Sequence, residues 1–248
     1  MNGVIKSLNE RIFRLWNEYK DKYKNEDVGF CPLPTFLRDF GERKVLVVGM
    51  NPSLNQKYKL NDKGRKVEDF INYVKGDYFD LNRDLNTLFN YEDLIGKYHQ
   101  YGKKISHFAE LIGMNQEYVR TIDLFYFRET NQKNFLNKIY AKDKSLTNFA
   151  KEQLAITVEA LQYYKPVMLI IANAKAASIA RDHFKEYGLP IEEKMDESYG
   201  CYYLKLNEDE KAPLLFSSTF SGQRALDNGS FERLAWQVRF IKKRKLHM

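Results

Sequence analysis

The sequence predicts an α/β sandwich built on a mostly parallel central sheet of four strands. Four short apolar runs, rich in β-branched residues, are typical of buried parallel strands. Amphipathic helical patterns lie between these runs, and such alternation favours a parallel sheet with helices packed on it. The chain has 248 residues, of which 44% are hydrophobic. This supplies enough apolar material for a core, and we expect one domain over residues 1–248.

The expected elements follow one another along the chain. An N-terminal helix at about residues 4–25 has apolar side chains at helical spacing. We expect strands at 44–49, 118–125, 167–172 and 214–218, and helices at 103–113, 147–164, 174–187 and 230–243. Residues 55–101 show few clean periods, and we interpret them as an insertion with short helices over one end of the sheet. Residues 200–206 are a candidate for an edge hairpin on that sheet.

The composition argues against secretion, membrane insertion and metal binding. No stretch approaches the 18 apolar residues of a membrane span, and the N-terminus lacks the apolar block of a signal peptide. Cys31 and Cys201 lie far apart in the sequence and are interpreted as inert thiols. The four histidines show no metal-ligand spacing. We therefore expect a cytoplasmic protein without a metal site, and the sequence leaves its oligomeric state open.

The net charge of +7 leaves two interpretations open. A basic chain suits a partner with a phosphate backbone, because each neutralised phosphate releases a counterion. Many cytosolic proteins reach the same charge without such a partner. The densest basic run, at residues 241–247, is interpreted as a solvated helix end whose cations complement the helix dipole.

Ligands of parallel α/β sheets bind at the carboxyl ends of the strands, so the residues after each strand are the candidates for function. The first such segment is Gly49-Met50-Asn51-Pro52-Ser53. A glycine there lets a ligand approach the backbone, and the proline fixes a turn that presents Asn51. The alternative is a turn in which the asparagine bonds only its own backbone.

The last of these segments, residues 217–227, joins a strand to a helix through small hydroxyl residues, one glycine, Arg224 and Leu226. Hydroxyl and backbone N–H groups bind phosphates or base edges. A leucine beside an arginine on a loop suits a finger that wedges into a duplex. The alternative is an ordinary strand–helix connection.

These motifs, taken together, resemble the uracil-DNA glycosylase superfamily. Its first active-site motif takes the forms Gly-Met-Asn-Pro-Gly and Gly-Ile-Asn-Pro-Gly. Residues 49–53 differ from the first form only at the last position, and from the second form also at Met50. Residues 119–125 and 165–177 resemble the second strand and the third strand with its Ala-rich helix. Residues 218–226 stand where the family has a His-Pro-Ser or Asn-Pro-Ser loop. The resemblance implies a three-layer α/β/α sandwich and a DNA partner, without a cofactor.

The resemblance also implies roles for single residues. Asn51 would hold the attacking water, while Gly49 and Met50 would lie against the flipped base and Pro52 and Ser53 against the adjoining phosphate. The remaining substrate-binding candidates are Asn173 at the third strand end, Ser221 and Gly222 in the second motif, and Phe125 or Phe127 as a stacking aromatic. Core packing is the alternative for both phenylalanines. Gln223, Arg224 and Leu226 would contact DNA and fill the gap in the duplex.

Two departures from the family pattern bear on catalysis. Asp123 aligns with an asparagine that reads the uracil edge, and an ionised carboxylate accepts hydrogen bonds but cannot donate them. It would repel uracil O4 and suit a donor such as an exocyclic amine. Thr219, or Ser218 with a shift of one position, replaces the histidine that bonds the departing base. A neutral hydroxyl should stabilise a departing anion less than a charge-assisted donor does.

Three functions remain open. The first is a monofunctional glycosylase that flips a damaged base, uracil or another deaminated base, and hydrolyses its bond to the sugar. Basic residues at 57–66 would then follow the DNA backbone. The second is a catalytically weak or inactive protein of the same fold that binds nucleic acid or a nucleobase. The third is a small-molecule enzyme that uses the same strand ends. Tyr98, His99 and Tyr101 either line the site or pack in the core.

Overall fold

The computed structural model describes residues 2–24, 34–52, 79–222 and 224–246. They form two compact units. The first unit draws on residues 1–39, 51–99 and 125–156, and the second on residues 40–50, 100–124 and 157–248. The second unit contains the sheet, and each unit is described by itself below.

The sheet of the second unit has five strands in the order β2-β1-β3-β5-β4. These are β1 (Val45–Gly49), β2 (Val119–Asp123), β3 (Met168–Ala172), β4 (Tyr202–Lys205) and β5 (Lys211–Ser217). The first four in this order are mutually parallel, and β4 pairs antiparallel with β5. The α/β class and the mostly parallel sheet are confirmed, whereas the expected number of four strands is wrong. The fifth strand is β4, which forms an edge hairpin with β5. It lies within residues 200–206, the segment that was the candidate for such a hairpin.

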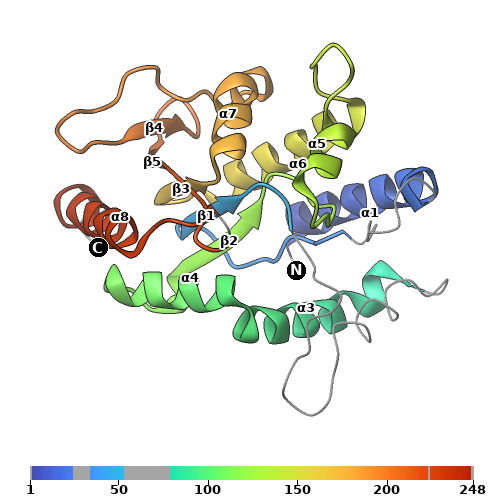
Figure 1. Ribbon diagram of the computed structural model, residues 1–248, viewed down its shortest axis with the longest axis horizontal. Coiled ribbons are helices and arrows are strands. Elements are labelled where there is room, and N and C mark those ends of the chain that lie inside the picture. The colour runs from blue at the N-terminus through green and yellow to red at the C-terminus, as the bar shows by residue number, and fades with distance from the viewer. Residues whose placement is uncertain (1, 25–33, 53–78, 223, 247–248) are drawn as a thin grey trace. The chain divides into compact units, whose positions relative to one another are not determined.

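Both faces of the sheet are covered by helices of the second unit (Figure 1). Val45, Val47, Met168 and Ile170 alternate along their strands and pack in one core with residues of α4 (Gln100–Leu111) and α8 (Asn228–Ile241). The intervening residues of β1 and β3 point to the other face and are equally buried. There α7 (Ala174–His183) contacts β3 and β5. This arrangement is consistent with a three-layer α/β class.

The longer elements that the structure describes in the first unit are helices, joined by irregular segments that include the isolated bridges Pro34–Phe127 and Tyr140–Leu146. These helices are α1 (Gly3–Lys24), α3 (Leu81–Tyr98), α5 (Gln132–Ile139) and the beginning of α6 (Asn148–Tyr164), which ends in the second unit. The expectation of short helices for residues 55–101 is wrong for α3, which has 18 residues. Leu81, Leu85 and Leu88 form its buried stripe at helical spacing.

Asn9 connects α1 to the segment that follows it in the first unit. This side chain is fully buried, donates to Leu37 O at 2.8 Å and accepts from Leu37 N at 2.8 Å. An amide that bonds both backbone groups of one residue replaces a missing strand partner. None of the helices in the described ranges is long and apolar enough to cross a membrane.

Candidate functional site

The carboxyl ends of four strands meet at one edge of the sheet in the second unit. The register pairs Gly49 with Asp123 and Ala172 with Ser217, and Val48 pairs with Ile171 one position earlier. The row across this edge is therefore Asp123, Gly49, Ala172 and Ser217, spanning about 14 Å at the usual strand spacing. Ala172 belongs to the core shared with α4 and α8, so the row faces those helices. Gly49 and Asp123, two candidates from separate strand ends, thus lie side by side.

Gly49 leaves space that the Asp123 side chain occupies. A Cβ built at Gly49 would overlap Asp123 Oδ1 and lie 3.3 Å from Asp123 Cγ. The glycine therefore lets the carboxylate lie across the end of β1. The structure gives a reason for glycine here that concerns a neighbouring side chain rather than backbone conformation.

Tyr101, near the start of α4, lies close to this carboxylate. Its ring is partly buried against the core of the second unit. Burial, and secondly the negative charge of Asp123, raise the pKa of the Tyr101 hydroxyl well above its ordinary value. The tyrosine is thus protonated at neutral pH, and Asp123 stands beside a polar group at the edge of the sheet rather than in open solvent.

Asn173 and Met50 have structural roles at the same edge. Asn173 Oδ1 accepts hydrogen bonds from Lys175 N at 2.9 Å and Ala176 N at 3.1 Å, which makes the residue the N-cap of α7. Met50 follows β1 directly, and its side chain is buried. The expected substrate contacts of both residues stay predictions.

The loop after β5 is anchored by an aromatic residue. Phe220 is buried, and its ring packs edge-on against Phe231 of α8 with centroids 5.2 Å apart. Gly222 has a φ of +94°, in the region that favours glycine. Leu226 is partly buried against the same core, and its N–H donates to Thr219 O at 3.0 Å. The leucine expected to protrude as a wedge thus lies against the core.

The polar groups of this loop are used unequally. Thr219 Oγ1 donates to Ser221 O at 3.1 Å, so the hydroxyl is engaged within the loop. Ser218 is exposed, and no described residue makes a hydrogen bond with its hydroxyl. Arg224 is exposed as well. Gln223, expected to contact DNA, lies outside the described residues.

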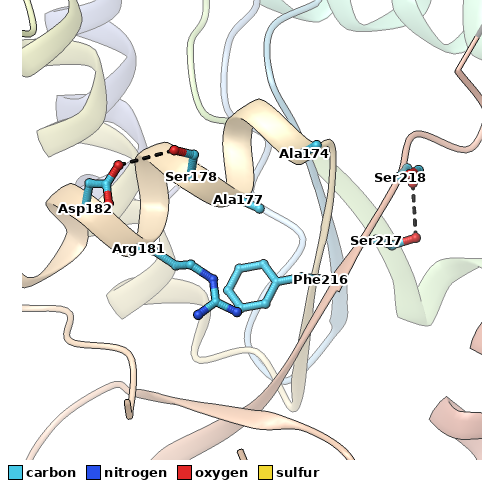
Figure 2. A pocket seen from close by; sticks show the side chains of 8 residues that line it. All are labelled: Ala174, Ala177, Ser178, Arg181, Asp182, Phe216, Ser217 and Ser218. Carbon is cyan, nitrogen blue, oxygen red and sulfur yellow. Dashed lines mark hydrogen bonds between the residues drawn. The ribbon is translucent and has the colours of Figure 1, made fainter. Parts of the chain in front are cut away.

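An open groove of about 560 Å³ runs between α7 and the end of β5 (Figure 2). Arg181 lies over the Phe216 ring at 4.0 Å and over the Tyr202 ring at 4.4 Å. No carboxylate in the described chain forms an ion pair with this guanidinium. The residues that line the groove are Ala174, Ala177, Ser178, Arg181, Asp182, Phe216, Ser217 and Ser218. Ser178 Oγ donates to Asp182 Oδ2 at 3.2 Å and Ser217 Oγ donates to Ser218 O at 3.1 Å, so Arg181 and the Ser218 hydroxyl are the groups here that suit a phosphate.

The sequence analysis did not identify Arg181, because this residue lies well beyond the end of β3 along the chain although it lines the same groove as the end of β5. The groove residues of α7 are 174, 177, 178, 181 and 182, which share one helical face. Extending the strand-end segment of residues 173–175 by two helical turns on that face would have found the arginine.

Asn51 belongs to the first unit, where backbone carbonyls fix its amide. Its Nδ2 donates to Glu129 O at 2.9 Å and to Pro52 O at 3.2 Å. Two carbonyl acceptors determine which end of the amide is nitrogen. Within the described chain no group donates to Asn51 Oδ1, so this oxygen is left to accept a hydrogen bond.

Glu129 holds this turn in place through its backbone and its side chain. Its N–H donates to Pro52 O at 3.1 Å. Its buried carboxylate accepts from Asn131 N at 2.9 Å through Oε1 and from Lys138 Nζ at 3.3 Å through Oε2. The side chains of Glu129 and Lys138 are 2% and 7% exposed. A buried ion pair therefore supports the segment that orients Asn51.

Phe125 and Phe127 lie in the core of the first unit, 0% and 1% exposed. Phe125 packs edge-on against Phe135 at 5.5 Å, and Phe127 packs against Phe149 at 4.7 Å. Core packing is what the structure shows for both rings, and a stacking role for either stays a prediction. Ser53, the last residue of the first motif, lies outside the described residues.

The structure thus brings Gly49, Asp123 and the start of the loop after β5 to one edge, and adds Tyr101 to them. Asn51 is part of the other unit. No protein-family model matches this chain, and no curated protein is significantly similar to it. Membership of the glycosylase superfamily therefore stays a prediction from the motifs.

Proposed function

We propose that this chain is a divergent monofunctional DNA glycosylase of the uracil-DNA glycosylase type. Its substrate would be a flipped base, uracil or another deaminated base, in DNA. The observation that carries the proposal is the orientation of Asn51. Its Nδ2 is held by two backbone carbonyls, and its Oδ1 has no partner among the described residues. An immobilised acceptor of this kind is what the positioning of a nucleophilic water requires.

The reaction needs an oriented water rather than a strong base. Asn51 Oδ1 would accept a hydrogen bond from a water whose oxygen forms the new bond to C1′ of the sugar. The bond from C1′ to the base nitrogen breaks, and its electron pair leaves with the base. The water gives up a proton to solvent. Because the sugar develops positive charge as the base departs, orientation and a polar oxygen nearby stabilise the transition state.

Asp123 and Tyr101 supply the basis for choosing a base. The Asp123 carboxylate accepts hydrogen bonds only, and its charge contributes to the raised pKa of Tyr101. A ring N–H or an exocyclic amine therefore suits this position, while a carbonyl oxygen facing Asp123 is disfavoured. Uracil, hypoxanthine and xanthine each present a ring N–H beside a carbonyl oxygen, so all three are tested.

A second candidate, a protein of the same fold that binds nucleic acid without turnover, is favoured by one observation. Thr219 Oγ1 already donates to Ser221 O. The hydroxyl would have to leave this bond before it could donate to a departing base. The groove around Arg181 and the exposed Ser218 would still bind phosphates under this candidate.

The deciding experiment uses end-labelled oligonucleotides bearing uracil, hypoxanthine or xanthine, each single-stranded and paired, cleaved with alkali after incubation. We expect excision by the native chain and a loss of about 100-fold or more in Asn51→Ala. Asn148→Ala is the matched control, because Asn148 is an exposed asparagine without a side-chain bond in the described chain.

Equal rates in Asn51→Ala and the native chain would refute the role of Asn51. If no oligonucleotide is excised but all are retained in a salt-sensitive way, the protein binds without turnover. Arg181→Ala then tests the feature that both candidates share, because it should weaken retention in both cases. If the chain neither excises nor retains any of the oligonucleotides, the third function remains, a small-molecule enzyme of the same fold.

A further inference from the structure

The outer face of α8 and of the short helix that follows it (Lys242–Leu246) has three stacked side chains. The rings of Trp236 and Phe240 stack with centroids 5.4 Å apart and planes 19° from parallel. The guanidinium of Arg244 lies over the Phe240 ring at 4.8 Å. We call Trp236, Phe240 and Arg244 the α8 ladder.

Trp236 and Arg244 of the ladder are exposed, whereas Phe240 is partly buried against the core and its ring lies 6.2 Å from that of Tyr199. The residues that hold α8 against the sheet lie on its other face and are Phe231, Leu234, Ala235, Val238 and Ile241. Trp236 is 58% exposed, more than any other large hydrophobic side chain in the described chain. Because Phe240 stacks on one face of the indole, the exposed side of Trp236 offers a flat aromatic surface on which another ring can stack.

The charge around the ladder is mostly positive, with one exposed carboxylate, Glu232, a helical turn before Trp236. Residues 228–246 contain six lysines and arginines and only one acidic residue, Glu232. Arg239 is exposed three residues after Trp236, and Lys243 is exposed three residues after Phe240, which places both beside the ladder. Lys242 instead donates to the carbonyls of Ile112 and Gly113, at 3.2 Å each, and is used within the fold.

We infer that the α8 ladder binds single-stranded nucleic acid. A base would stack on the exposed face of Trp236, and the neighbouring phosphates would pair with Arg239 and Lys243. Base–aromatic stacking combined with a basic groove or face is the general mode of sequence-independent single-strand binding. A duplex does not fit as well, because its bases already stack on one another and offer no face to an indole.

The inference is independent of base excision and is tested with an undamaged strand. The chain contains two tryptophans, and Trp16 is 7% exposed in the first unit. In Trp16→Phe, which keeps an aromatic ring in that cluster, all tryptophan emission comes from Trp236. Titration with the oligonucleotide dT20 should quench this emission saturably, and the concentration dependence should match the anisotropy of labelled dT20.

Variants of the ladder should weaken binding in defined ways. Trp236→Ala is expected to raise the Kd for dT20 about tenfold, while Trp236→Phe keeps most of the affinity. Lys243→Ala should lower the slope of log K against log salt by about 0.7. Tyr118→Ala is the matched control and should leave the Kd unchanged, because Tyr118 is another exposed ring, 43% accessible, with Lys44 over it at 4.5 Å.

Three results would overturn the inference. The first is emission of Trp236 that stays constant during the titration, whether dT20 binds elsewhere on the chain or does not bind at all. The second is an unchanged Kd in Trp236→Ala. The third is quenching or a blue shift with vesicles of phosphatidylserine but not with dT20, which would make the ladder a membrane-surface contact.

Discussion

Asp123 is the register partner of Gly49 at the ends of β2 and β1, and its carboxylate fills the space that a side chain at position 49 would need. The identity of one residue therefore sets the position of the other. The first prediction tests this dependence.

Gly49→Ala should displace the Asp123 carboxylate and lower the free energy of unfolding by about 1–3 kcal/mol, because the added Cβ overlaps it. Urea denaturation measures the loss. The double variant Gly49→Ala with Asp123→Ala removes the overlapping group, so it should be destabilised less than the sum of the two single changes. Strict additivity would mean that the two side chains do not compete for this space.

The raised pKa of Tyr101 predicts a loss of stability in alkali. Its folded pKa lies above the unfolded value of about 10, so the native state retains a proton that the unfolded chain loses. The contribution is complete below about pH 10 and declines as the pH rises toward the folded pKa. Tyr101→Phe should therefore lose less stability than the native chain between about pH 9 and about pH 11, as measured by urea midpoints.

Asp123→Asn reveals how much of this effect is electrostatic. Because burial is the larger cause and the Asp123 charge the second, this variant should recover only part of the alkaline loss. If the stability of Tyr101→Phe fell with pH as steeply as that of the native chain, groups other than Tyr101 would cause the loss of stability in alkali.

Asn9→Ala should destabilise the first unit by about 2–4 kcal/mol. The change leaves the buried N–H and C=O of Leu37 without their partner, and an unpaired buried polar group costs about 1–3 kcal/mol. Thermal and urea unfolding measure the cost. Glu10→Ala, an exposed change on the same helix, is the control and should stay within about 0.5 kcal/mol of the native chain. Equal effects of the two changes would contradict the role of Asn9.

Removing one partner of the buried pair Glu129–Lys138 should cost about 3–5 kcal/mol, because the other charge stays buried without compensation. Glu129→Gln is the single change, and Glu129→Gln with Lys138→Met should recover part of the loss. Lys211→Met breaks a half-exposed pair with Glu192 and should cost about 1 kcal/mol or less. If Glu129→Gln were as mild as Lys211→Met, the buried pair would not support the turn at Asn51.

The parallel strands were predictable because both faces of the sheet are covered. The central strands β1 and β3 are apolar throughout and stand out in the sequence without any period, whereas β2, at the edge of the sheet, contains Arg120 and Thr121. The edge strand β4 has only four residues, and their burial is mixed, so the sequence suggested this strand only as a candidate. The helix α5 was missed, since only Phe135, Lys138 and Ile139 of its eight residues are buried, and one of these is charged.

The candidate site was predictable only where chain order determines position. Strand ends follow from the strands themselves, which is why Gly49, Asp123 and Ser218 were named. The contact of Arg181 with Phe216 depends on how α7 lies against β5, and the bonds of Asn51 depend on a segment 78 residues away. Spacing in the sequence contains neither relation.

The position of β1 in the sheet has a consequence for how this protein folds. Val45 pairs with Val119 on one side and with Met168 on the other, 74 and 123 residues further along the chain. By contrast, β4 and β5 form a local hairpin. Contacts between distant segments carry a large loop-closure cost and slow the search for the native state. We expect the hairpin to form early and β1 to join the sheet late. Partly folded chains would then lack the row of residues at the carboxyl edge, which forms only in the last folding step.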